Sequence, residues 1–153
     1  MKPKWWEKSK KYLCKKDKVI KRLINSYKGH LTTRNNFFYS LTRSIISQQI
    51  SVSAAESVFL KFQKKCNGKI KPKTVSKLSI SDLRRCGLSR MKAIGIKSLS
   101  EKILNKSFNP RLIKNMTDEE AIVYLSSLRQ IGRWSSEMVL IFFYNRPNIW
   151  PVQ

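Results

Sequence analysis

The chain is poor in the residues that build metal centres, disulfide frameworks and histidine-dependent catalytic pairs. Its 153 residues include three cysteines and one histidine. Cys14, Cys66 and Cys86 are odd in number and widely spaced, so they match neither a zinc or iron–sulfur ligand set nor a disulfide framework. His30 has no partner visible in the sequence, so we expect a loop residue. The sequence therefore predicts free thiols and no metal site.

Long apolar runs and acidic residues are also scarce. No stretch of 18 apolar residues occurs, and the start, "MKPKWWEKSKKYLCKKDK", lacks the apolar core of a signal peptide. We therefore expect no membrane partner and a cytoplasmic protein, associated with the nucleoid if bacterial. Nine acidic residues stand against 32 lysines and arginines, which gives a formal charge of +23. These cations are spread along the chain, which favours a polyanion-binding surface, with nucleic acid preferred over acidic lipid.

The residues that are present predict one all-α domain. Hydrophobic residues make up 41% of the chain and aromatic residues 10%, which is enough to bury a core without disulfides or metals. Apolar residues recur every three or four positions without sustained alternation, which is typical of short amphipathic helices. One buried face is expected to consist of Phe38, Leu41, Ile45 and Ile46. A second helix is expected to carry an apolar stripe of Val19, Ile20, Leu23, Ile24 and Tyr27.

Capping residues mark where these helices begin and end. Side-chain oxygens that accept the free amides of a first turn are expected from Asp17, from Ser51 or Ser53, and from Ser89. Thr117 and Glu120 have the spacing of a capping box. Glycines that end helices are expected at Gly29, Gly68 and Gly87. The sequence therefore predicts a bundle of many short helices.

The stretch "LRQIGRWSSEMVLIFF" predicts a tight helical hairpin. One helix ends near Leu128 and the next begins near Trp134, about four or five residues later. Gly132 allows a positive φ or the close approach of a ligand. The amides of Ile131, Gly132 and the following turn are expected to point outward, where a helix N-terminus favours a phosphate and Arg133 adds charge. An ordinary turn with a C-capping glycine explains these residues about as well.

This segment resembles the helix-hairpin-helix of DNA glycosylases. Their common form, Leu-Pro-Gly-Ile-Gly-x-x-Thr-Ala, aligns with Leu128–Ser136. Upstream, "FFYSLTRSIISQQISVSAAESVFLKF" and "LRRCGLSRMKAIGIKSLSEKI" resemble two segments of the 3-methyladenine DNA glycosylase II (AlkA-type) branch, and together the matches cover residues 5–153 in order. The resemblance implies an all-α HhH-GPD bundle in a single domain, 1–153. Residues 34–127 would form its central bundle, and 1–33 and 128–153 parts of a second subdomain.

Two departures from the family pattern bear on chemistry. Gln130 replaces the first hairpin glycine, and a left-handed backbone there would cost about 1 kcal/mol. This puts in doubt the monovalent cation that hairpin carbonyls hold in some family members; no other cofactor is expected. The family's catalytic aspartate would follow Gln153, so we expect a chain incomplete at its C-terminus, with no catalytic residue of its own. Glu137 does not replace it, since helix-dipole stabilisation in the first turn accounts for this residue.

The resemblance also implies roles for residues around the hairpin. Glycosylases of this superfamily that also cut the backbone carry a lysine where Trp134 falls, so the chain resembles a monofunctional enzyme. Trp134 and Met138 would line the base pocket, where stacking of an indole on a cationic purine contributes about 0.5–2 kcal/mol. Trp134 as a plain core residue is the alternative. Gln49 would fill the gap left by the extruded base, or else cap the helix of "SVSAAE".

The remaining candidates would contact the DNA backbone. They are Arg90 and Lys92, for which a solvated basic face is the alternative, and the hairpin residues Gln130, Ile131, Gly132, Arg133 and Ser135. The implied function is hydrolytic removal of alkylated purines, of the 3-methyladenine type, from damaged double-stranded DNA by a monomer. A chain without the carboxylate would bind DNA with very little activity. The alternatives are a non-catalytic helix-hairpin-helix module that recognises distorted duplex, and a basic helical protein whose hairpin is only a turn.

Overall fold

The computed structural model describes residues 2–32 and 34–151, which are entirely helical apart from turns and loops. The elements are α1 (Trp6–Lys16), α2 (Lys18–Ser26), α3 (Phe37–Ser47), α4 (Val52–Lys65), α5 (Pro72–Val75), α6 (Ile80–Arg85), α7 (Arg90–Leu104), the 3-10 helix η1 (Pro110–Asn115), α8 (Asp118–Ser126) and α9 (Arg133–Phe142). The predicted all-α class is confirmed. Within these residues, every helix is too short or too polar to cross a bilayer.

Side-chain caps begin these helices largely as predicted. Asp17 accepts from the amides of Val19 and Ile20 at the start of α2. Ser51 accepts from the Ala54 amide and caps α4, so Ser51 and not Ser53 is the capping residue. Ser89 caps α7, and the Thr117–Glu120 capping box is present at the start of α8. These local bonds explain why element starts were predictable from the sequence.

The ends of some helices differ from expectation. Helix α2 ends at Ser26 with Tyr27 in extended backbone, before Gly29 is reached. Two short elements, α5 and η1, were not predicted, because four and six residues are too few to show a helical period. Each begins with a proline, whose fixed φ suits the first helical position.

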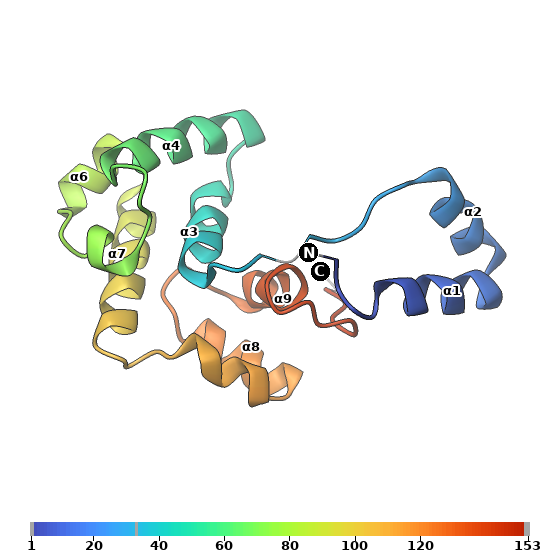
Figure 1. Ribbon diagram of the computed structural model, residues 1–153. Coiled ribbons are helices and arrows are strands. Elements are labelled where there is room, and N and C mark those ends of the chain that lie inside the picture. Colours follow the sequence, from blue (N-terminus) through green and yellow to red (C-terminus); the bar gives the residue numbers. More distant parts are fainter. Residues whose placement is uncertain (1, 33, 152–153) are drawn as a thin grey trace.

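The core lies between α3, α4 and the helices that follow. The predicted face of α3 is confirmed, because Phe38, Leu41, Ile45 and Ile46 are all buried. Further buried apolar residues come from α4 to α9, among them Phe62, Leu83, Ile96, Leu125 and Leu140. Helix α3 occupies the middle of the bundle, with α4, α6 and α7 on one side of it and α8 and α9 below (Figure 1).

Helices α1 and α2 stand apart from this core. They project from the side of the bundle opposite α6 and α7 (Figure 1), and neither contains a buried residue. The predicted stripe of α2 is therefore largely uncovered, with Val19, Leu23 and Tyr27 exposed. The segment before α1 is held to the bundle by Trp5, whose indole Nε1 donates to the carbonyl of Asn145 at 2.6 Å. The predicted division into 34–127 and a second subdomain of 1–33 and 128–153 stays a prediction.

Candidate functional site

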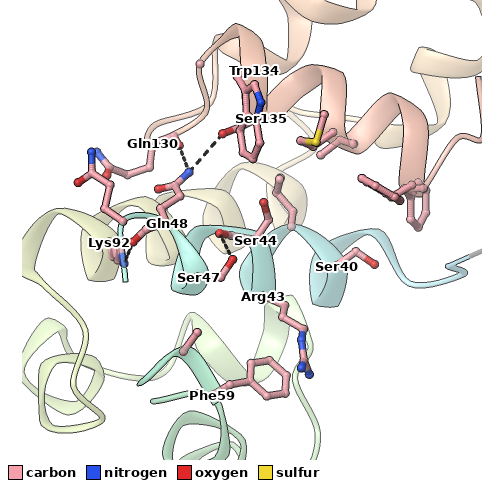
Figure 2. A pocket seen from close by; sticks show the side chains of 18 of the residues that line it. Ser40, Arg43, Ser44, Ser47, Gln48, Phe59, Lys92, Gln130, Trp134 and Ser135 are labelled. Carbon is pink, nitrogen blue, oxygen red and sulfur yellow. Dashed lines mark hydrogen bonds between the residues drawn. The ribbon is translucent and has the colours of Figure 1, made fainter. Parts of the chain in front are cut away.

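A cavity of about 990 Å³ opens between α3, α4 and α9. Trp134, Met138 and Phe142 follow one another at four-residue intervals along α9, and all three line it. Figure 2 shows the Trp134 indole on the α9 side of this space, facing the α3 side chains. The indole is 48% exposed, so the alternative that Trp134 is a core residue is wrong. The structure thus places both predicted pocket residues, Trp134 and Met138, on one cavity wall.

The facing wall, on α3, carries hydroxyl groups. Ser40, Ser44 and Ser47 line the cavity from positions four and three residues apart (Figure 2). Ser40 is 7% exposed, and its hydroxyl makes no hydrogen bond to any residue that the structure describes. This wall was not predicted from the sequence, although the spacing of the serines places them on the side of the helix next to the buried apolar face. The cavity therefore offers an aromatic and thioether surface on one side and hydroxyl groups on the other.

The α4 side of the cavity carries an ion pair. Arg43 of α3 donates to Glu56 of α4 at 2.6 Å, and its guanidinium lies 4.6 Å from the centre of the Phe59 ring. Glu56 is the one carboxylate among the lining residues in the described part of the chain. Both partners are about half exposed, so the pair contributes little to stability. Its effect on the site is to hold the Glu56 carboxylate against a cation.

The predicted hairpin is confirmed, with a connection of residues 127–132 that is slightly longer than expected. Gln130 has a φ of 69°, so the position of the missing glycine is left-handed and strained. Gly132 has a φ of −96°, so of the two possibilities that the sequence left open for this glycine, a positive φ is excluded and the close approach of a ligand remains. It is the N-cap of α9, which also excludes a C-capping glycine. A side chain at Gly132 would meet nothing within 4 Å, so a ligand can approach closely.

The amides at the start of α9 form the hairpin's binding surface. The Ile131 amide donates to the carbonyl of Leu128 at 3.1 Å, so the prediction that it points outward is wrong. Gly132 supplies no side-chain cap, and the amides of Gly132 and of the first turn, Arg133 to Ser135, meet no acceptor among the described residues. Unpaired donors at a helix N-terminus favour an anion. The predicted phosphate site therefore consists of fewer amides, starting at Gly132.

Arg133 has carboxylate partners within the protein. Its guanidinium donates to both oxygens of Glu119, at 2.9 and 2.6 Å, and its Nε donates to Glu137 at 3.1 Å. The bonds to Glu119, more than the nearby Glu137, raise the pKa of Arg133, and Arg133 in turn lowers the pKa of Glu119. Glu137 is only 6% exposed and lies beyond the first turn of α9, so its assignment to the helix dipole is wrong. A phosphate contact by Arg133 stays a prediction.

Lys92 supports the end of α3. Its Nζ donates to the carbonyls of Ile46 and Gln48, at 2.9 and 2.6 Å, and burial lowers its pKa. The alternative of a solvated basic face is therefore wrong for Lys92. Arg90, two residues earlier and the first residue of α7, is exposed. For both residues the phosphate contact stays a prediction, and Lys92 would have to share its donors with the two carbonyls.

Gln48, which was not predicted as a site residue, joins the end of α3 to the hairpin. Its Nε2 donates to the carbonyl of Gln130 at 2.9 Å and to Oγ of Ser135 at 3.3 Å (Figure 2). Gln49 follows with a φ of 57°, is exposed and lines the cavity. Because Ser51 caps α4, the alternative that Gln49 is the cap is wrong. Gap filling by Gln49 stays a prediction.

Gly95 of α7 was also missed. A Cβ there would lie 2.8 Å from Cγ of Gln130 and 3.3 Å from the carbonyl oxygen of Arg129. The hairpin thus packs directly on the α7 backbone. Gln130 takes a left-handed conformation, which the glycine of the family pattern could adopt without strain. The monovalent cation on the hairpin carbonyls stays a prediction.

A family model described as the HhH-GPD superfamily base excision DNA repair protein matches residues 42–152. The chain is 29% identical over 138 residues to DNA-3-methyladenine glycosylase 1 of Schizosaccharomyces pombe, covering 88% of this chain and 60% of the relative. It is 31% identical over 118 residues to the alkylbase DNA glycosidase-like protein mag2 of the same yeast, covering 74% and 55%. The chain thus spans little more than half the length of these relatives.

Solved structures share the fold. The structure of the 3-methyladenine DNA glycosylase Mag1 of S. pombe, in complex with abasic DNA, matches with a TM-score of 0.79 at 29% sequence identity. The match covers 94% of this chain and 73% of the Mag1 chain. The DNA-3-methyladenine glycosidase of Bacillus halodurans has a TM-score of 0.79 at 23% identity, covering 91% and 64%, and supports the fold alone. With the family model matching most of its length, the chain belongs to the HhH-GPD superfamily of base excision DNA repair proteins.

Proposed function

We propose that this chain carries the DNA-binding and base-recognition part of a monofunctional DNA glycosylase acting on alkylated purines of the 3-methyladenine type. The observation that carries the proposal is the position of Trp134, half exposed on a cavity wall and next to the uncapped N-terminus of α9. The names of the two yeast relatives and the Mag1 complex with abasic DNA agree with it.

The cavity is suited to an extruded, positively charged base. An indole ring attracts a cation over its face, and the Met138 sulfur next to it is polarisable. The serine hydroxyls of α3 can donate to or accept from the edge of a purine. A base in the duplex must leave the stack to reach such a pocket, at a cost of a few kcal/mol that a side chain in the gap partly offsets. Gln49, at the rim, is our candidate for that side chain.

The hairpin would hold the DNA backbone beside the cavity. The free amides from Gly132 to Ser135 give the start of α9 a partial positive charge, and a phosphate oxygen can approach because Gly132 has no side chain. The chain's net charge of +23 adds long-range attraction that salt would screen. Phosphate contacts by Arg90, Lys92 and Arg133 are part of this proposal.

Hydrolysis of an N-glycosidic bond builds positive charge on the sugar, which a carboxylate stabilises. The position of the expected aspartate follows Gln153 and lies outside the described residues. Glu56 is in the cavity, but its ion pair with Arg43 makes it a poor substitute. Because the described lining residues include no unpaired carboxylate, a non-catalytic module that recognises distorted duplex is a second candidate function.

Two measurements test the proposal. The first is the affinity for a duplex with a stable abasic-site analogue and for the intact duplex, at several salt concentrations. We expect tighter binding to the abasic duplex and a steep fall in both affinities with salt. If the affinity depended neither on the abasic site nor on the salt concentration, this result would contradict any role on DNA. The second is release of methylated adenine from alkylated DNA by the chain extended with an Asp-Leu-Gly continuation and the helices that follow it in the family: lesion binding without any release by this extended form would favour the non-catalytic module.

A further inference from the structure

We infer that Gln48 is a positioning residue that couples the backbone-binding hairpin to the rim residue Gln49. The inference deepens the proposed function and rests on it. Gln48 is the residue immediately before Gln49, yet its side chain bonds to the hairpin, more than 80 positions later in the sequence. A single residue thus links the two elements that we expect to touch DNA on either side of the cavity.

The side-chain amide of Gln48 is held at the hairpin by two acceptors. Its Nε2 lies 2.9 Å from the carbonyl oxygen of Gln130 and 3.3 Å from Oγ of Ser135. The first acceptor belongs to the strained residue of the turn, whose φ is 69°. The second belongs to the first turn of α9, where the free amides are. The amide therefore fixes the turn and the helix N-terminus relative to each other.

The backbone of Gln48 is held as firmly on the other side. The Lys92 ammonium lies 2.6 Å from the Gln48 carbonyl oxygen and 2.9 Å from that of Ile46, at the end of α3. Gln49 follows directly, in a left-handed conformation with a φ of 57° that a residue other than glycine adopts only where its surroundings hold it. The position of Gln49 is consequently determined by the residue before it.

The hairpin has little freedom to move away from Gln48 and the end of α3. Gly95 allows Gln130 to lie against the α7 backbone, at a separation where even a Cβ would clash. Lys92 and Gly95 belong to the same helix, α7. Helix α7 therefore supports both Gln48, through Lys92, and Gln130, through Gly95, and the hydrogen bond between Gln48 and Gln130 sets the spacing from the phosphate site to the gap.

The test replaces Gln48 by methionine, which keeps the length and charge but removes the donor. Gln63→Met is the matched control, since Gln63 is half-buried on α4 and does not line the cavity. The measured quantity is the ratio of affinities for abasic-analogue and intact duplexes. We expect Gln48→Met to lower this ratio about fivefold, the value of one hydrogen bond, with the control unchanged. If Gln48→Met does not fold, Gln48→Asn, whose amide is too short to reach the hairpin, takes its place.

Measuring Gln48→Met in a second background, Gln49→Ala, distinguishes coupling to Gln49 from a purely structural role of Gln48. If Gln48 acts through Gln49, then Gln48→Met has no further effect on the ratio once Gln49→Ala is present, because coupled residues are not additive. Equal effects in both backgrounds, or an unchanged ratio in the single variant, would overturn the inference. Failure of the proposed function is distinguishable, since the wild-type chain would then show no preference for the abasic duplex.

Discussion

Gly95 and Gln130 lie so close together that a methyl group on Gly95 would stand 2.8 Å from Cγ of Gln130. The nearby Arg129 carbonyl oxygen, at 3.3 Å, belongs to backbone and cannot turn away as a side chain can. This contact seats the hairpin on α7. It also explains a glycine within a helix, where it otherwise costs stability.

We expect Gly95→Ala to destabilise the protein by about 1–3 kcal/mol, because the hairpin must shift to admit the methyl group. Urea unfolding followed by circular dichroism measures this change. Gly132→Ala is the control, since it has open space and a negative φ, and it should leave the unfolding midpoint nearly unchanged. Equal stability of Gly95→Ala and wild type would show that the hairpin does not rest on α7.

Gln130→Gly should stabilise the protein by about 1 kcal/mol, because it relieves a left-handed backbone at a φ of 69°. Thermal unfolding measures the gain as a higher Tm. The matched change Gln63→Gly, inside the right-handed helix α4, should lower the Tm instead. A lower Tm for Gln130→Gly as well would contradict the strained turn.

Arg133→Ala should lower the urea midpoint, because it leaves the buried carboxylate of Glu137 without its cation. Glu119→Gln, which removes only the exposed partner, should have a much smaller effect. Adding Glu137→Gln to Arg133→Ala should restore part of the loss by removing the unpaired charge. If the single and double variants unfold alike, the Arg133–Glu137 pair is not what holds this part of α9.

Cys66 should resist alkylation in the folded protein. Its side chain is buried, and this burial raises the pKa of the thiol from 9.0 to about 11. Because only the thiolate reacts, iodoacetamide at pH 8 should label the half-buried Cys14 first, with Cys66 following only after urea is added. The unfolded thiol ionises at lower pH than the folded one, so the free energy of unfolding should fall as the pH rises from about 9 towards 11. Labelling of Cys66 as fast as Cys14 would contradict its burial.

The sequence predicted what local bonds and periodicity determine. The caps at Asp17, Ser89 and Thr117 depend on side chains within three residues, and the buried face of α3 follows from spacing alone. Trp134 and Met138 were found because the family pattern positions them. Each of these features can be inferred from a few consecutive residues or from a known motif.

What the sequence did not predict depends on contacts between distant segments. Three contacts join residues that are far apart in the chain: the hydrogen bond from Gln48 to Gln130, the packing of the hairpin against Gly95, and the hydrogen bonds of Lys92 to the end of α3. The backbone conformation of Gly132 was also left open by the sequence, because glycine permits both signs of φ and only the packing of the hairpin selects one.

The most direct test of the account compares Trp134→Ala with wild type on two duplexes of one sequence, one carrying an alkylated or etheno-modified purine and the other a stable abasic analogue. If the indole receives the extruded base, the variant should lose about three- to tenfold in affinity for the duplex with the base, the value of one aromatic stacking contact, and almost none for the abasic one. An equal loss on both duplexes, or no loss on either, would contradict the central claim that the cavity beside the hairpin is the base pocket.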